Sequence, residues 1–247
     1  MRQLKIKAYW WCEVPNFGDA LAPFLLKRFA DVETTWDTVS RASVVSIGSL
    51  LDHIPPLWDG YVLGSGKLYE SSRLHLHTKT ANILALRGPL SAAQSPPGDY
   101  AIGDPGLLAP ELIPLPEKLY DLGILPHWSD HSLEHDPQFR SPKWSTMLIR
   151  PEWPPLEVVQ RIGMCRKIVT SSLHGMVVAD AYGIPRRFEY SPSLAREGVF
   201  KFLDYSRSIQ TPFENGKLVE ASRFRIEDRQ HDIFDAYQAF GSEMRHQ

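Results

Sequence analysis

Hydrophobic positions along the chain fall into two alternating patterns. Short apolar runs rich in β-branched and aromatic residues, each followed within a few residues by Gly or Pro, predict strands. Longer stretches with apolar residues three and four apart predict helices with one buried face. The predicted strands cover residues 5–11, 43–47, 61–63, 83–86, 119–125, 146–149 and 167–169, and the predicted helices cover 19–29, 156–165, 173–182 and 217–240. Strands and helices that alternate at this spacing form parallel βαβ units.

A proline-rich stretch separates the two halves of this pattern. Residues 105–116 carry four prolines in twelve positions, which excludes a long helix and a central strand. We predict that this stretch connects two Rossmann-like α/β domains, residues 1–110 and 111–247, that face each other across a cleft. The last helix is expected to pack back on the body of the protein.

Composition limits the class of protein. The 247 residues suffice for one large α/β domain or two compact ones. With 27 Lys and Arg against 29 Asp and Glu, the formal net charge is −2, which excludes a general nucleic-acid coat and a disordered polyanion. Cys12 and Cys165 lie far apart, and no apolar run has the length of a membrane span. The sequence predicts a soluble cytoplasmic protein and leaves its oligomeric state open.

Ligands of open α/β sheets bind beyond the carboxyl ends of the strands, so the loops after the predicted strands are the candidate sites. The loop 170–175 is the most informative of them. It places Ser171, Ser172 and His174 at the start of a helix, where backbone N–H groups and the helix dipole bind phosphate or carboxylate. The alternative is a serine that only caps the helix and a histidine that packs.

Cations for an anionic ligand come from two places. Arg87 ends a predicted strand just before a helix that Pro89 opens, so its guanidinium is placed to bind a carboxylate or phosphate. An ion pair with a nearby acid is the alternative. Residues 140–187, which include Arg150, hold eight Lys and Arg but three Asp and Glu. These cations are expected to serve an anionic ligand or, alternatively, to be solvated surface charges.

Three other segments are weaker candidates. Residues 16–19 supply a glycine turn and the Asp19 carboxylate, whose alternative role is to cap the following helix. Residues 64–67 have the wrong spacing for a phosphate-binding loop of an NTPase, and no dinucleotide fingerprint follows the first strand. His127, His131 and His135 have metal-ligand spacing on a helix, but the prolines that bound the segment argue against a regular helix.

Together these segments resemble the polysaccharide pyruvyl transferase family. The resemblance is carried by residues 16–19, 64–66, 87–91, 103–105, 126–127, 171–175 and 179–185. It implies a glycosyltransferase-B-like fold with an acceptor-side domain at residues 1–110 and a donor-side domain at 111–247. It also implies transfer of the pyruvyl group of phosphoenolpyruvate to two hydroxyls of one sugar in an exopolysaccharide precursor. The product is a cyclic pyruvate ketal, and phosphate is released.

The resemblance assigns roles to the candidate residues. His174, titrating near neutrality, would act as acid or base or stabilise phosphate, and Asp19 would be the acceptor base. Many members have Arg-Leu-His-Gly where this chain has Ser172-Leu173-His174-Gly175, so another cation must compensate. We expect Arg87 to do so first and Lys67 or Arg150 next. The remaining substrate-binding candidates are Asn16, Gly18, Gly64, Ser65, His127, Ser171, Ser172, Leu173 and Gly175.

The expected partners are phosphoenolpyruvate and a saccharide, with a lipid-linked oligosaccharide at the cytoplasmic face of the inner membrane as the favoured acceptor. Trp10, Trp11, Trp128 and Tyr69 are candidates to stack on its sugar rings. Neither a metal nor a cofactor is expected, because fixed positive charge can stabilise the anions. Two alternatives stay open: a glycosyltransferase that uses a nucleotide-activated sugar, and a non-catalytic protein that binds an anion or sugar.

Overall fold

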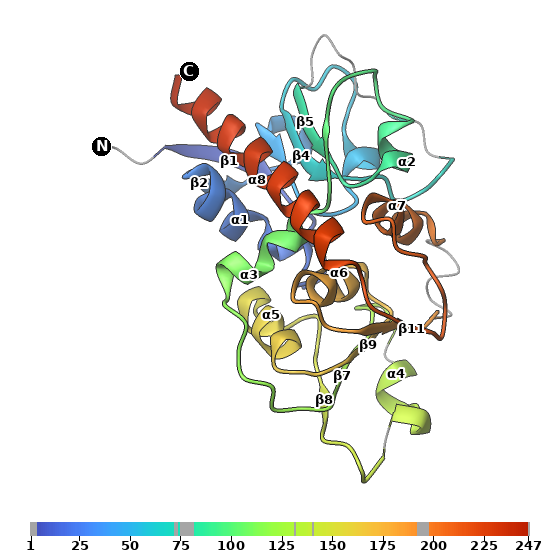
Figure 1. Ribbon diagram of the computed structural model, residues 1–247. Coiled ribbons are helices and arrows are strands. Elements are labelled where there is room, and N and C mark those ends of the chain that lie inside the picture. Colours follow the sequence, from blue (N-terminus) through green and yellow to red (C-terminus); the bar gives the residue numbers. More distant parts are fainter. Residues whose placement is uncertain are drawn as a thin grey trace.

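The computed structural model describes residues 4–71, 74, 82–130, 132–139, 141–191 and 198–246. The first of its two sheets is parallel throughout and has the strand order β2-β1-β3-β4-β5-β6. Its strands are β1 (Lys5–Tyr9), β2 (Glu33–Trp36), β3 (Val44–Val45), β4 (Tyr61–Ser65), β5 (Asn82–Leu86) and β6 (Ala101–Ile102). In Figure 1 this sheet fills the upper part of the molecule.

The second sheet has the order β11-β10-β9-β7-β8 and is parallel except for the pair of β10 and β11. Its strands are β7 (Leu122–Leu125), β8 (Thr146–Leu148), β9 (Ile168–Thr170), β10 (Arg186–Phe188) and β11 (Leu218–Val219). Two sheets with connecting helices confirm the prediction of two Rossmann-like α/β domains.

Helices connect the strands and cover the sheets. They are α1 (Ala22–Ala30), α2 (Pro89–Ala92), α3 (Ala109–Leu112), α4 (Ser132–His135), α5 (Pro155–Gly163), α6 (Leu173–Ala181), α7 (Phe200–Ser208) and α8 (Arg223–His246). Five short 3-10 helices are η1 (Asp19–Leu21), η2 (Val39–Arg41), η3 (Leu51–His53), η4 (Pro105–Leu108) and η5 (Pro137–Phe139). None of the helices in the described ranges is long and apolar enough to cross a membrane.

The proline-rich stretch forms two short helices, η4 and α3, between β6 of the first sheet and β7 of the second. Pro105 and Pro110 each stand in the first turn of their helix, where a missing N–H group costs nothing. Leu107, Leu108 and Ala109 are buried, and η4 packs against both α6 and α8. The first part of the connection, residues 105–109, is therefore in the packed interior, whereas Glu111 and Leu115 are exposed.

The C-terminal helix α8 returns from the second sheet to the first, crossing the molecule diagonally in Figure 1. It packs against α1 and against β4, β5 and β6. Ile233, Tyr237 and Phe240 are fully buried there, and the Tyr237 hydroxyl hydrogen-bonds to Ser46 Oγ. The predicted start of this helix at residue 217 was wrong, since Leu218 and Val219 instead pair with β10 as a strand.

Candidate active site

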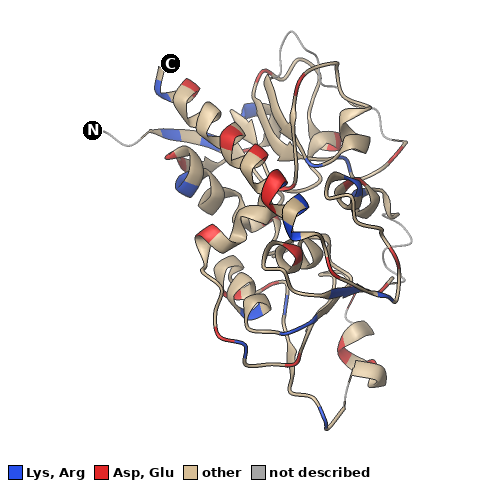
Figure 2. Cartoon of the chain, in the orientation of Figure 1, with Lys and Arg blue, Asp and Glu red and all other residues tan. Residues whose placement is uncertain are grey.

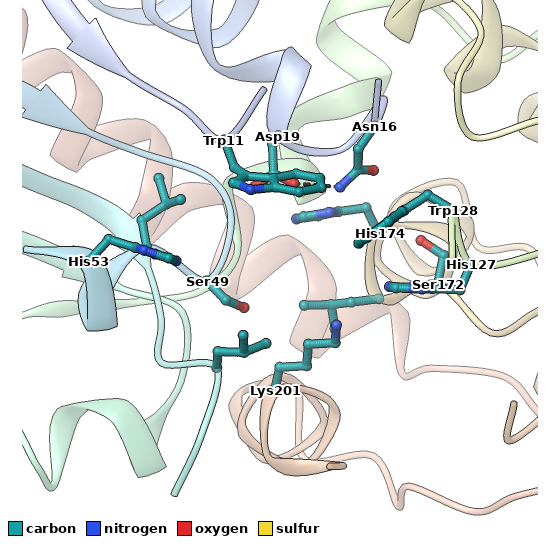
Figure 3. A pocket seen from close by; sticks show the side chains of 13 residues that line it. Trp11, Asn16, Asp19, Ser49, His53, His127, Trp128, Ser172, His174 and Lys201 are labelled. Carbon is teal, nitrogen blue, oxygen red and sulfur yellow. Dashed lines mark hydrogen bonds between the residues drawn. The ribbon is translucent and has the colours of Figure 1, made fainter. Parts of the chain in front are cut away.

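A pocket of about 200 Å³ lies between the two sheets, and we call it the central pocket (Figure 3). The first domain contributes residues that follow three of its strands, with Leu68 coming after β4. Trp11, Asn16 and Asp19 come after β1, and Ser49 and Leu50 come after β3. These positions agree with the rule that ligands of open α/β sheets bind beyond the carboxyl ends of the strands.

The second domain contributes residues that follow β7 and β9. His127 and Trp128 come after β7, and Ser172, Leu173 and His174 come after β9. Ser172 is the N-cap of α6, and its Oγ accepts a hydrogen bond from the N–H of Gly175 at 3.4 Å. The central pocket therefore includes the N-terminus of α6, where N–H groups and the helix dipole favour an anion.

The His174 ring is held by the first domain as well as by α6. The edge of Phe17 meets it with 6.4 Å between the ring centroids. Gly18 lies directly against the ring, since a Cβ atom at Gly18 would stand 1.9 Å from His174 Nδ1. Behind the ring, His174 Nε2 is 3.9 Å from Asp104 Oδ2. Gly18 is therefore needed for space, because its φ of −60° is one that any residue adopts.

Burial decides the protonation of His174. The side chain is almost completely buried, and this lowers its pKa to about 3, with the positive charges of Arg87 and Lys201 adding to the effect. The expectation that this histidine titrates near neutrality is therefore wrong. At neutral pH the imidazole is uncharged, and it can accept a proton but has none to spare as an acid.

Asp19 shows the opposite shift. Burial raises its pKa to about 7, while Lys201 lowers it and Asp104 raises it. Its Oδ2 accepts a hydrogen bond from Asn16 Nδ2 at 2.5 Å. Its Oδ1 occupies the space beside Gly48, where a Cβ atom would be only 2.1 Å away. Near neutral pH Asp19 therefore holds its proton part of the time, a property of general acids.

Lys201 of α7 also lines the central pocket, and we did not find it from the sequence. In Figure 3 its side chain rises into the pocket from the side opposite Asp19. It is 7% exposed, and its charge lowers the pKa values of both Asp19 and His174. In the described part of the chain it is the lysine or arginine that reaches the pocket lining. Little in the sequence indicates this role, because polar and apolar residues are mixed along α7.

Aromatic side chains from both domains form the rim of the central pocket. Trp11 and Trp128 contact each other with 5.1 Å between their ring centroids, and His127 packs beside Trp128 at 5.4 Å. The N–H of His127 donates to Ser171 Oγ at 2.8 Å, so Ser171 joins two loops behind the pocket lining. His131, the second of the three histidines with metal-ligand spacing, lies outside the described residues.

Arg87 does not reach the central pocket. Its guanidinium is fully buried and pairs with Asp204 of α7, with an Nη2–Oδ2 distance of 3.1 Å. It also donates to Ser49 Oγ and to the carbonyl of Lys67. The same Asp204 carboxylate accepts hydrogen bonds from the backbone N–H groups of Leu90 and Ser91. Arg87 thus has the alternative role that we left open, an ion pair with a nearby acid.

The end of β4 lies behind the pocket, while Leu68 in the loop after it belongs to the pocket lining. Gly64 has a φ of +88°, and a Cβ atom there would be 2.5 Å from Pro105. Ser65 Oγ accepts from Leu50 N–H and donates to the Gly48 carbonyl, so it shapes the segment that carries Ser49. The Lys67 ammonium donates to the Glu70 carbonyl at 3.0 Å. These contacts give Gly64, Ser65 and Lys67 structural roles at the positions where the sequence predicted substrate contacts.

The basic stretch at residues 140–187 is largely taken up by ion pairs, and Figure 2 shows basic and acidic segments interspersed over both halves of the molecule. Arg150, predicted as a donor-binding cation, pairs with Glu134 and Glu152. Four other arginines of the stretch pair with acids in the same way, namely Arg161, Arg166, Arg186 and Arg187. The formal surplus does not supply the pocket, because Asp and Glu from neighbouring elements neutralise it.

Comparison with known proteins finds one similar family and two similar proteins. The model of the family described as polysaccharide pyruvyl transferase matches residues 67–188. The succinoglycan biosynthesis protein ExoV of Rhizobium meliloti is 29% identical over 228 residues, which cover 87% of this chain and 68% of that protein. Over residues 67–188 the chain is therefore similar to the polysaccharide pyruvyl transferase family. An uncharacterized protein, L143, of Acanthamoeba polyphaga mimivirus is 24% identical over 81% of this chain and 73% of its own.

The polysaccharide pyruvyl transferase match covers one side of the central pocket. Residues 67–188 include His127 and His174, which line the pocket, and Asp104, which lies next to His174. Asp19 and Lys201 lie outside the matched range, one before it and one after it. The central pocket is therefore completed by segments that lie before and after the matched range.

Proposed function

We propose that this protein transfers the pyruvyl group of phosphoenolpyruvate to two hydroxyls of a sugar in an exopolysaccharide precursor, forming a cyclic ketal and releasing phosphate. The observation that carries the proposal is the meeting of three groups in one pocket. His174 supplies a neutral base, Asp19 supplies an acid with a pKa of about 7, and Lys201 supplies positive charge. They come from α6, η1 and α7.

Phosphoenolpyruvate carries a phosphate and a carboxylate, and its site must offer positive charge and N–H donors. Lys201 and the N-terminus of α6 offer both, and both line the central pocket. Ser172 replaces the arginine found in many family members, and its hydroxyl adds a neutral hydrogen-bonding group there. Lys201 takes the compensating role that the sequence assigned to Arg87, Lys67 or Arg150.

The reaction requires one acid and one base at the start. The methylene carbon gains a proton, and a sugar hydroxyl adds to the neighbouring carbon while its own proton passes to a base. The bond between that carbon and the phosphate oxygen then breaks, and the electron pair leaves with phosphate. The second hydroxyl adds to the resulting cation and loses its proton to the base or the departing phosphate, which closes the ketal.

The pKa values assign the two roles. Asp19, protonated part of the time near neutral pH, donates the proton to the methylene carbon. His174, neutral because its pKa is about 3, accepts the hydroxyl proton. This reverses the expected role of Asp19, because burial keeps its carboxyl protonated part of the time near neutral pH. Each positioned acid or base contributes about 10²–10⁴-fold to the rate.

The acceptor is placed at the aromatic rim. Trp11 and Trp128 line the central pocket and contact each other, and aromatic rings of this kind can stack on sugar rings. Support for a polysaccharide acceptor comes from the family and from the relative named for succinoglycan biosynthesis. A lipid-linked oligosaccharide at the cytoplasmic face of the inner membrane is the form of acceptor that we propose.

The test measures ligand binding by thermal shift and calorimetry. Phosphoenolpyruvate should stabilise the protein, and nucleotide sugars should not. Lys201→Met should weaken phosphoenolpyruvate binding about 10–150-fold, the loss of one charge-assisted hydrogen bond. The control is Lys217→Met, because Lys217 is exposed and lies outside the pocket lining. Stabilisation by nucleotide sugars alone would instead identify the protein as a glycosyltransferase.

A further inference from the structure

Two buried polar atoms face each other behind the central pocket. Asp104 Oδ2 and His174 Nε2 are both inaccessible, and neither is hydrogen-bonded to any described residue. Their separation of 3.9 Å is slightly longer than a hydrogen bond. Leaving such an atom unsatisfied costs about 1–3 kcal/mol, so two that point at each other are the natural partners of one bond.

Independent contacts fix each side of this pair. Asp104 Oδ1 accepts a hydrogen bond from Gly106 N–H at 2.9 Å and so caps η4, which packs against α6. This leaves Oδ2 directed at the histidine. On the other side, Phe17 and Gly18 hold the His174 ring, with Gly18 against Nδ1. The ring therefore presents Nε2 to Asp104 and keeps Nδ1 on the side of the first domain.

We propose that Asp104 is a positioning residue that accepts a hydrogen bond from Nε2–H of His174 and thereby fixes the imidazole with its lone pair on Nδ1. The proposal rests on the proposed function, in which His174 accepts the sugar hydroxyl proton, and it names the atom that accepts it. A carboxylate that bonds one ring nitrogen sets the tautomer and makes the other nitrogen more basic.

The charges around the pair are consistent with this arrangement. Burial raises the pKa of Asp104 to about 6, so its carboxylate is mostly ionised at neutral pH and accepts a hydrogen bond. The neutral His174 then donates through Nε2. The other charged groups that act on one or both members of the pair are Asp19, Arg87, Lys201 and Asp204.

The first test reads the tautomer directly in the full chain without substrate. Nitrogen-15 NMR distinguishes a protonated ring nitrogen from an unprotonated one, and the signals that vanish in His174→Gln belong to His174. We expect Nε2 protonated and Nδ1 unprotonated at neutral pH, with a change near pH 6 as Asp104 takes up a proton. A His174 that carries its proton on Nδ1 would overturn the proposal.

The second test uses Asp104→Asn, which keeps an oxygen for the Gly106 bond but presents an amide N–H to Nε2. The proton of His174 should move to Nδ1, and kcat for pyruvyl transfer should fall about 10²–10⁴-fold. The KM for phosphoenolpyruvate should change much less. The control is Asp136→Asn, because Asp136 accepts a backbone hydrogen bond from Gln138 at 2.9 Å and lies outside the pocket lining.

The outcomes separate this inference from the proposed function. An unchanged tautomer and rate in folded Asp104→Asn would overturn the role of Asp104. If the wild-type protein has the predicted tautomer but binds nucleotide sugars and not phosphoenolpyruvate, the hydrogen bond is supported and pyruvyl transfer is rejected. If Asp104→Asn does not fold, the wild-type nitrogen signals still decide whether Nε2 carries the proton.

Discussion

Replacing Asp19 by asparagine should make the protein more stable and inactive at the same time. The side chain is buried and 7% exposed, and its pKa rises from 3.8 to about 7 because ionisation is unfavourable there. Asparagine has nearly the same shape, and its amide oxygen can still accept the hydrogen bond from Asn16. The substitution therefore removes an acid while it leaves the local packing in place.

The magnitude follows from the pKa. A raised carboxyl pKa means that the folded state keeps a proton that the unfolded chain has lost. The contribution of Asp19 to stability is therefore highest below about pH 4, falls as the pH rises toward 7, and is level above that value. At about 1.4 kcal/mol for each pH unit, the cost of ionised Asp19 reaches about 4 kcal/mol. For a chain of this size that corresponds to roughly 8–16 °C in Tm.

The assay is thermal and urea unfolding of the wild-type protein and Asp19→Asn at about pH 5 and about pH 8. The variant should gain more stability at the higher pH, while pyruvyl transfer falls about 10²–10⁴-fold. Asp37→Asn is a control for which the expected change in stability has the opposite sign. Lys7 and the Thr38 N–H hold the Asp37 pKa down to about 2, so its loss should destabilise the protein above pH 4. A stability gain for Asp19→Asn that is equal at both pH values would refute the reasoning.

Three further substitutions test other parts of the account. Arg87→Ala leaves the buried carboxylate of Asp204 without its partner and should cost about 3–5 kcal/mol in urea unfolding; unchanged stability with weaker phosphoenolpyruvate binding would return Arg87 to the pocket. Gly18→Ala places a Cβ atom 1.9 Å from His174 Nδ1, so kcat should collapse while circular dichroism shows a folded protein; normal turnover would contradict the assigned ring position. Trp128→Ala should raise the KM of the acceptor and leave phosphoenolpyruvate affinity unchanged in calorimetry; equal acceptor KM values would exclude stacking on this ring.

The sequence predicts the central strands well, because they are short apolar runs buried on both faces. Residues 61–65 and 122–125 are fully buried, and both were recognised from this pattern. Strand β2 was missed because its residues, Glu33–Trp36, are partly exposed and half polar at the edge of the sheet. Strand β10 was missed because it begins with Arg186 and Arg187.

The burial of helix α7 is the feature that is hardest to predict from the sequence. Lys201, Asp204, Ser206 and Ser208 are all buried, so a helix that reads as half polar has no solvated polar face. Asp204 is buried because it pairs with Arg87 and caps α2, both of which come from the first domain. Such contacts between distant segments have no local signature in the sequence.

The candidate site divides in the same way. Asn16, Asp19, His127, Ser172 and His174 follow strand ends, where the topology of an α/β sheet directs ligand-binding residues, and all of them line the central pocket. Which cations reach that pocket depends on pairing with distant acids, as Arg87 and Arg150 show. The approach of Asp104 to His174 likewise depends on how η4 packs against α6.

The most direct test of pyruvyl transfer follows the donor carbon itself. The protein is incubated in heavy water with lipid-linked oligosaccharides and phosphoenolpyruvate that is isotope-labelled at the phosphate-bearing carbon. We predict that the label appears in a saccharide as a ketal carbon with one deuterium on its methyl group, that phosphate is released, and that Asp19→Asn and His174→Gln abolish both. The account would be contradicted if the label stayed in phosphoenolpyruvate and the same protein instead transferred a sugar from a nucleotide sugar to the same acceptors.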